Sequence, residues 1–160
     1  MASPRTGLAA ALLLVPALSA GSGAQALGHH AAAAPALRAP IITESFRPVL
    51  PCNEGTTLGQ EGCAEHEVVA LDRQLDADVR IVFGLLADDA ARRDFIAAQM
   101  AWTRYRSADC NSQSDVYQGG TEQPVVYGLC LASDDASRRQ DIKGFFAQLT
   151  QDRATVPKFP

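Results

Sequence analysis

The chain lacks the residue patterns that most often carry catalysis or metal binding. It contains no glycine-rich phosphate loop, no pair of Cys-x-x-Cys motifs and no His-Glu-x-x-His sequence. Histidine is also scarce, since His29 and His30 fall in an alanine- and proline-rich stretch and only His66 follows it. A triad through His66 would need a positioned serine or a free cysteine as well. We therefore predict that the protein is not an enzyme and has no catalytic residue, cofactor or metal site.

Basic residues are in deficit relative to acidic ones. The chain has 14 Lys and Arg residues, of which only two are Lys, against 18 Asp and Glu, for a formal net charge of −4. Because nucleic-acid phosphates require a basic footprint, this balance argues against a nucleic-acid partner. The acids are unevenly placed, since residues 54–89 hold nine of them against Arg73 and Arg80. The negative charge is thus expected on the first helix.

Long hydrophobic runs are absent except at the N-terminus. Residues 8–20 are almost entirely apolar, Arg5 is the only charge before them, and Ala24-Gln25-Ala26 offers small residues to a signal peptidase. Residues 1–26 are therefore predicted to be a cleaved signal peptide, with Ala20 as a second possible end. The run is too short for a stable membrane span, and no cysteine that could carry a lipid follows closely. We expect a secreted or periplasmic protein.

Residues 27–51 are predicted to form a flexible arm. Four alanines are followed by four spaced prolines, which interrupt any helix, and few bulky side chains are available to pack. The arm is expected to have no fixed structure before about Ile41, although Ile41, Ile42 and Phe46 could lie along the folded body. The folded domain is predicted to span residues 52–152, and residues 153–160, with two more prolines, form a frayed tail.

No segment alternates like a β-strand, and from residue 57 the apolar residues follow a helical period. The first helix should be capped by Thr56 or Thr57 and end near Asp88 and Asp89, which can cap the second helix. Its apolar stripe consists of Val68, Leu71, Leu75, Val79, Val82, Phe83 and Leu86.

The second helix is predicted to reach about Cys110, with Phe95, Ala98, Trp102 and Tyr105 facing inward. Residues 111–124 resemble a loop by composition, and residues 125–149 are helical with a break near Ser133, where Ser133-Asp134-Asp135 looks like a new cap. The expected fold is all-α: a small bundle of three to four helices stapled by two disulfides, preceded by the disordered arm.

Four cysteines in a secreted chain indicate two disulfides. Three pairings are possible, and the sequence alone does not choose among them. We favour the nearest-neighbour arrangement, in which Cys52–Cys63 fastens the arm to the first helix and Cys110–Cys130 closes the loop between the second and third helices. Each such loop would stabilise the fold by roughly 3 kcal/mol on the chain-entropy model.

Trp102 and Arg106 lie four residues apart and so share one helical face. Arg106 could stack on the indole while reaching a carboxylate such as Asp72, and Arg138 could join them in a partly buried ionic network. A structural core pair is the favoured interpretation of these residues over a binding site.

These residues also carry a resemblance to a known family. Gln99, Trp102, Arg106 and Cys110, then Gly119-Gly120, Cys130 and Arg138, resemble the pattern Gln-x-x-Trp-x-x-x-Arg-x-x-x-Cys, Gly-Gly-Ser, Cys-x(7)-Arg of the LprI-like family of lysozyme inhibitors. Upstream, Cys63, Asp72 and Leu75 look like the Cys, Asp and Leu of that family's first long helix. The resemblance covers residues 52–149 and implies a small secreted helical domain. Its signature residues are interpreted as determinants of the fold, namely Asp72, Gln99, Trp102, Arg106, Gly119, Gly120 and Arg138.

The chain departs from the family pattern at several positions. Asp76 replaces an Asn, Val79 replaces a Tyr whose hydroxyl could have served a partner, and Asp135 replaces a Thr. Asp76 and Asp135 are read as mild changes in capping or exposed positions.

The resemblance implies a binding protein, and a basic lysozyme is the expected partner. The candidate contact surfaces are the polar loop, residues 112–123, and an acidic helix face that includes Asp72, Asp76 and Asp78. Two alternatives remain: an interaction module for another cell-envelope protein, and an unrecognised hydrolase, which would require a cleft.

Overall fold

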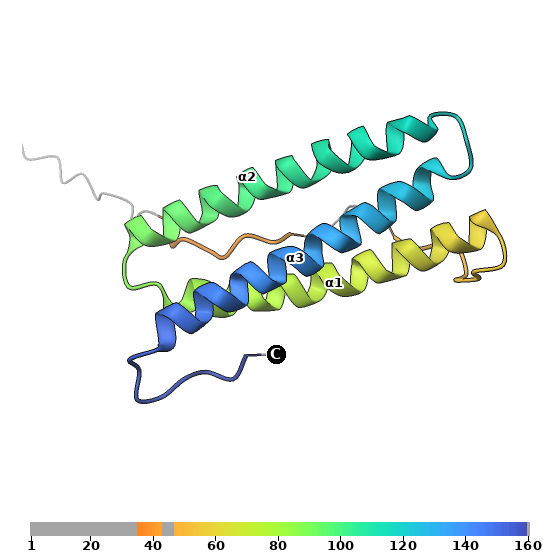
Figure 1. Ribbon diagram of the computed structural model, residues 1–160. Helices are drawn as coiled ribbons and strands as arrows, with labels where there is room; N and C mark the ends of the chain where they lie inside the picture. The colour runs from red at the N-terminus through yellow and green to blue at the C-terminus, as the bar shows by residue number, and fades with distance from the viewer. Residues whose placement is uncertain (1–34, 43–46, 160) are drawn as a thin grey trace, which may run out of the picture. The chain divides into compact units, whose positions relative to one another are not determined.

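The computed structural model describes residues 35–42 and 47–159, and the predicted signal peptide lies outside these ranges. Three long helices account for most of this part: α1 (Thr57–Leu85), α2 (Asp89–Ser114) and α3 (Gln123–Thr150) (Figure 1). A short 3-10 helix, η1 (Asp115–Tyr117), follows α2. No strand occurs in the described ranges, which confirms the all-α prediction.

The helix starts follow the capping rules. Thr56 is the N-cap of α1, where its hydroxyl accepts a hydrogen bond from the Gly59 amide at 3.0 Å. Asp88 is the N-cap of α2, where its carboxylate accepts one from the Ala91 amide at 2.8 Å. Each cap satisfies an amide that the first turn of a helix leaves without a carbonyl partner. Both caps were among the predicted candidates.

The predicted end of the second helix and the predicted break in the third helix were wrong. α2 continues past Cys110 to Ser114, so η1 and only five further residues connect it to α3. α3 is unbroken from Gln123 to Thr150, with no new start near Ser133. The reason is that Asp135 is fully buried and paired with an arginine of α2, so it serves the interior instead of capping a helix.

The buried face of α2 differs from the predicted one. Ala98 and Tyr105 were expected inside, but both are exposed. The buried positions are Phe95, Gln99, Arg106, Cys110 and Ser114, with Trp102 partly buried. Two polar residues therefore occupy the centre of the buried face, a pattern that a search for apolar periodicity does not detect.

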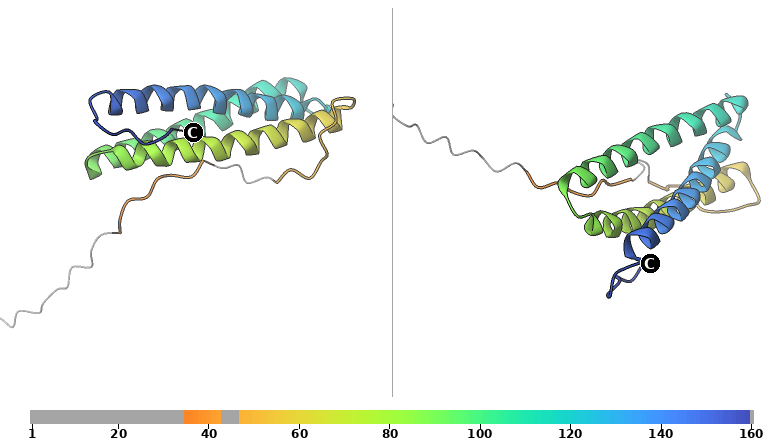
Figure 2. Two further views of the ribbon diagram at one scale, coloured as in Figure 1. Left: turned by 90° about the horizontal axis from the view of Figure 1, so that it is seen from below. Right: turned by 60° about the vertical axis from the view of Figure 1, so that its left-hand side comes forward.

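Helix α3 packs against both α1 and α2, and it lies between them in the view of Figure 1. It approaches α1 closely at Gly128, where an added Cβ atom would lie 2.8 Å from the Cβ of Ala64. Figure 2 shows α2 diverging from α1 when the bundle is turned. The Gly128–Ala64 contact therefore fixes how closely α1 and α3 approach at this end.

The core has two apolar clusters with a polar layer between them. One cluster contains Val68, Leu131, Ala132 and the Cys110–Cys130 pair. The other consists of Ile42, Leu75, Val79, Val82, Leu86, Phe95 and Ile142. On each helix a polar residue falls between the two clusters, namely Asp72 on α1, Arg106 on α2 and Asp135 on α3.

Two segments outside the helices complete the second cluster. Residues 35–42 run without helix or strand, and Ile42 is 2 % exposed and donates its amide to Asp76. Ile41 is exposed, and Phe46 lies outside the described residues. At the C-terminus, Phe159 packs against Phe146 with ring centroids 4.5 Å apart. This contact was not predicted, because residues 153–160 were expected to be a frayed tail.

Candidate functional site

The two disulfides join the pairs favoured from the sequence. Cys52 is bonded to Cys63, and Cys110 is bonded to Cys130. The first connects the segment before α1 to the second turn of that helix. The second connects α2 to α3 inside the smaller apolar cluster. Both disulfides lie toward the same end of the bundle, where the α2–α3 connection meets the start of α1.

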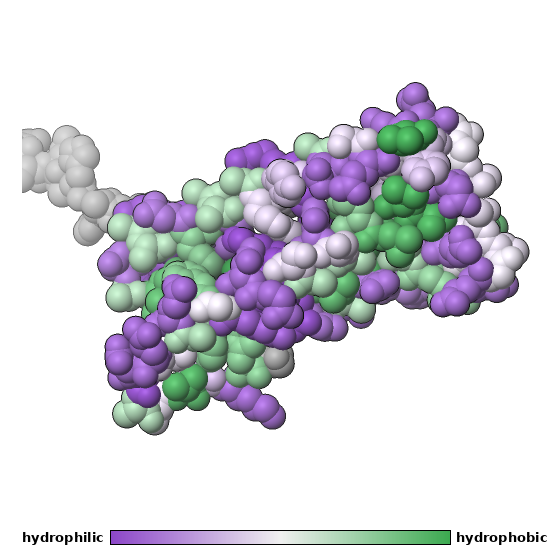
Figure 3. All heavy atoms as spheres, viewed as in Figure 1, coloured by the Kyte–Doolittle hydropathy of each residue, from purple (hydrophilic) through white to green (hydrophobic). Residues whose placement is uncertain are grey.

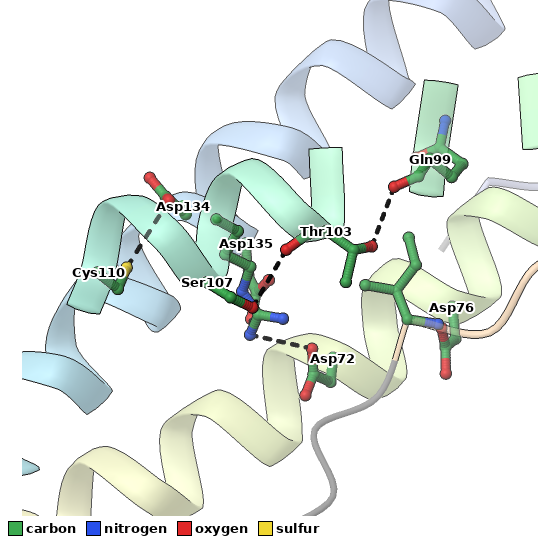
Figure 4. Close-up of polar contacts among 10 residues, drawn as sticks. Asp72, Asp76, Gln99, Thr103, Ser107, Cys110, Asp134 and Asp135 are labelled. Carbon is green, nitrogen blue, oxygen red and sulfur yellow. Dashed lines mark hydrogen bonds and ion pairs between the residues drawn. The ribbon is translucent and has the colours of Figure 1, made fainter. Parts of the chain in front are cut away.

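Arg106 is the centre of a buried ionic cluster that involves all three helices. Its side chain is 1 % exposed, and its Nη2 lies 2.8 Å from Asp135 Oδ2 and 3.3 Å from Asp72 Oδ1. Asp72 and Asp135 reach this position from α1 and α3 (Figure 4). The predicted contact between Arg106 and Asp72 is confirmed. Asp135 was missed, although its spacing of four from Leu131 and seven from Ile142 places it on their buried face.

Trp102 lies between two arginines. The guanidinium carbon of Arg106 is 5.5 Å from its ring centroid, and that of Arg138 is 5.7 Å away. Arg138 donates to Gln99 Oε1 at 3.3 Å and forms an ion pair with Asp141 at 3.4 Å. Arg138 is thus connected to Arg106 through Trp102, and its ion pair is with Asp141. The geometry agrees with a role of these residues in the fold.

Asp76 and Asp78 do not form a solvent-exposed acidic face with Asp72. Their exposed fractions are 7 % and 0 %, and that of Asp72 is 2 %. Asp78 Oδ2 accepts from Arg139 Nε at 2.8 Å, and Asp76 accepts from the Ile42 amide. Burial raises the pKa of Asp76 by removing its carboxylate from water, an effect that the Ile42 hydrogen bond reduces and the neighbouring Asp72 increases. These carboxylates are directed into the fold, so they are unavailable to a partner.

A group of exposed and partly exposed acids lies at the end of the bundle that carries the disulfides. Residues 48–72 and 107–137 contain no Lys or Arg. They hold ten acids, of which Asp72 and Asp135 face Arg106. We call this part of the molecule the acidic end. Its remaining acids are Glu54, Glu61, Glu65, Glu67, Asp109, Asp115, Glu122 and Asp134.

Two acids of the acidic end, Asp109 and Asp134, lie close together. The pKa of Asp134 is raised, first because its carboxyl is partly buried and then because Asp109 lies nearby on α2. The sequence predicts the excess negative charge on the first helix alone. The fold adds the start of α3 and the end of α2, which are distant in the sequence.

A groove runs between α1 and α3 at the acidic end. Its volume is about 540 Å³, and its lining combines carboxylates with aliphatic side chains. We call it the α1–α3 groove, and its lining residues are Glu54, Gln60, Cys63, Ala64, Glu67, Glu122, Val125, Val126 and Leu129. A smaller groove of about 170 Å³ lies beside Glu61, Glu65 and Tyr127. Figure 3 shows hydrophobic residues exposed over the N-terminal half of α3, with hydrophilic residues around them.

The four cysteines and the buried ionic cluster all lie within residues 52–142. A protein-family model described as lysozyme inhibitor LprI matches residues 52–142, which is more than half of the chain. The chain belongs to the LprI family. No curated protein and no solved structure matches it. The LprI match begins at the first cysteine and ends at Ile142 within α3.

The LprI signature glycines lie in the turn before α3. Gly119 has a φ of 79°, in the left-handed region that favours glycine. Its amide donates to Gln123 Oε1 at 3.2 Å, and the Gly120 amide donates to the Tyr117 carbonyl at 2.9 Å. The two glycines therefore shape the connection that brings Glu122 to the α1–α3 groove.

One group of potential metal ligands occurs among the described residues. Asp109, Cys110, Cys130 and Asp134 place their potential ligand atoms within 4.8 Å of one another. Both sulfurs belong to a disulfide, so the group offers two carboxylates and no thiolate. His66 is exposed on α1 and is not part of this group. Among the described residues, no helix is long and apolar enough to cross a membrane.

Proposed function

We propose that this LprI-family protein binds a basic lysozyme through its acidic end and thereby inhibits it. The observation that carries the proposal is the segregation of charge: residues 48–72 and 107–137 contain acids but no Lys or Arg. Complementary charge on two proteins accelerates their encounter and orients them before contact. The family description, a lysozyme inhibitor, supplies the class of partner.

Lysozymes are typically basic and carry their paired carboxylates in a groove that binds the polysaccharide. An acidic protein that covers such a groove would block access of the polysaccharide without any chemistry of its own. This agrees with the scarcity of catalytic motifs in the sequence. Inhibition would then depend on a folded acidic surface, which both disulfides hold in place.

The predicted signal peptide and the two disulfides support action outside the cytoplasm, where disulfides form and persist. Lysozyme and its polysaccharide substrate are also found outside the cytoplasm. Secretion or periplasmic location is therefore part of the proposal.

Inhibition of a basic C-type lysozyme by the oxidised mature protein tests the proposal. We expect loss of muramidase activity as the protein is titrated, with weaker inhibition as the salt concentration rises from low to physiological, because mobile ions screen exposed charges. Unchanged muramidase activity at a large molar excess of the protein would contradict the proposal. The protein would then be an interaction module for another cell-envelope protein.

A further inference from the structure

We propose that the α1–α3 groove is the docking site for a basic segment of the partner, and that an arginine or lysine side chain of that segment lies along it. This inference rests on the proposed function, because it specifies where on the acidic end the lysozyme is held. It goes further by naming the groove and the chemistry of its occupant.

The floor of the groove is aliphatic. Val125, Val126 and Leu129 of α3 line it, and Leu129 is 51 % exposed. A half-exposed leucine gains from any partner that covers it. Arginine and lysine side chains have long hydrocarbon stems that lie well on such a surface while their charged heads remain at its polar edge.

The rim of the groove is acidic on several sides. Glu54 comes from the segment before α1, Glu67 from α1 itself, and Glu122 from the turn before α3. All three are exposed, and neither of the chain segments that form the acidic end contains a Lys or Arg. A cationic head therefore meets carboxylates at the rim, whereas an acidic segment would be repelled. Charge complementarity thus selects a basic occupant over an acidic or a purely apolar one.

The wall that carries Glu54 is fixed before any partner arrives. The Cys52–Cys63 disulfide ties this segment to α1, and Cys63 itself lines the groove. Gln60 Nε2 donates to the Glu54 carbonyl at 3.0 Å, and the Asn53 amide donates to the Gly59 carbonyl at 3.1 Å. A wall held in place in the free protein loses less entropy on binding, which favours tight association.

The smaller groove provides a matched control. It also has two glutamates, Glu61 and Glu65, from the same half of α1, but its volume is about 170 Å³. Replacing both by Gln removes as much charge from the acidic end as replacing Glu67 and Glu122. The two double variants therefore differ in which groove they alter and not in net charge.

Affinity for a basic C-type lysozyme is measured for both double variants by calorimetry or surface plasmon resonance. We expect Glu67→Gln/Glu122→Gln to bind at least about tenfold more weakly than the wild type, because close charge pairs at an interface are lost. Glu61→Gln/Glu65→Gln should lose about threefold or less, since it alters only the long-range attraction. Leu129→Ala should weaken binding more than Leu58→Ala, which truncates an exposed leucine beside a neighbouring hollow.

A second experiment tests the groove without lysozyme, and so independently of the proposed function. A synthetic peptide of alternating arginine and leucine is titrated into the labelled protein, and methyl resonances of Leu129 and Val126 are followed by NMR. We expect shifts of these methyls in the wild type and in Glu61→Gln/Glu65→Gln, and their loss in Glu67→Gln/Glu122→Gln.

The outcomes are distinguishable. If both double variants weaken lysozyme binding equally, or the control weakens it more, the α1–α3 groove is not the docking site. The proposed function is then unaffected. A wild type that does not bind lysozyme but captures the peptide in the groove overturns the proposed function and supports the docking site. Failure of both probes overturns both.

Discussion

Arg106 connects the three helices at the level of a single side chain. It is buried with two carboxylates, Asp72 from α1 and Asp135 from α3, and its guanidinium also faces Trp102. Removing the arginine from such a cluster takes this counter-charge away from two buried carboxylates, which costs far more than the loss of an exposed ion pair. The interior of the bundle therefore depends on a polar contact as much as on its apolar clusters.

We predict that Arg106→Ala lowers the free energy of unfolding by about 3–5 kcal/mol, because two buried carboxylates lose their ion pair with its guanidinium. Urea denaturation of the oxidised protein measures this change. Arg104→Ala, on the exposed side of the same helix, is the control and should change the stability by no more than about 0.5 kcal/mol. Equal effects of the two substitutions would contradict a structural role for the cluster.

Asp76 provides a test in which pH is the variable. Burial raises its folded-state pKa above the ordinary value of 3.8, so ionising this carboxyl opposes folding. Its contribution to stability is fully present below the unfolded-state pKa and is lost as the pH rises through the folded-state pKa. We predict that Asp76→Asn, which keeps an oxygen acceptor for the Ile42 amide, becomes more stable relative to wild type as the pH is raised from about 3 to 7.

Asp76→Ala is the companion variant. It removes the acceptor and leaves the buried Ile42 amide without its partner, which should cost about 1–3 kcal/mol throughout this range. Chemical denaturation at several pH values distinguishes the two substitutions. A stability difference between Asp76→Asn and wild type that does not change with pH would show that this carboxyl titrates normally.

At the scale of the helices, the Gly128–Ala64 contact fixes how closely α1 and α3 approach. We predict that Gly128→Ala destabilises the protein by about 1–3 kcal/mol, because the new methyl group would lie 2.8 Å from the Cβ of Ala64 and the helices must separate. Gly144→Ala is the matched control in the same helix. Nothing lies within 4 Å of its added Cβ, so it should stabilise the protein by about 0.5–1 kcal/mol.

Thermal unfolding of both glycine variants measures the difference. Because the two substitutions have the same intrinsic helix propensity, their opposite signs would isolate the steric term. Two stabilising substitutions would show that α1 and α3 are not in close contact at Gly128.

The helices themselves were largely predictable from local rules. Thr56 and Asp88 have the side chains that accept hydrogen bonds from free amides, and cysteines close in the sequence paired as expected. Where a residue's role depends on a distant partner, local rules failed. From the local sequence, Asp135 resembles a helix cap and predicts a break near Ser133. In the structure it pairs with Arg106 of α2, and α3 is unbroken.

The candidate site was less predictable than the fold. Asp72, Asp76 and Asp78 were selected as acids on one helix, but the helix buries all three against basic or amide partners. The acids of the acidic end belong to two separate segments, residues 48–72 and 107–137, so their convergence depends on how α3 packs on α1. Tertiary packing, which no local pattern encodes, decides which carboxylates remain in water.

At the scale of the whole folded chain, basic residues are unevenly distributed along the bundle. The acidic end has no Lys or Arg, whereas all the basic residues that follow Arg47 lie in residues 73–106 and 138–158. Such a division orients an approaching basic protein and favours contact with one end. The α1–α3 groove, with its aliphatic floor, lies where this orientation brings the partner.

The most direct measurement is the rate constant for association with a basic C-type lysozyme as a function of ionic strength. We predict fast association at low salt that slows as salt is added, and a further slowing when Glu67 and Glu122 are replaced by Gln. Replacing Asp94 and Asp152, exposed acids outside the acidic end, by Asn should leave the rate nearly unchanged. An equal effect of both pairs, or a rate independent of salt, would contradict the account.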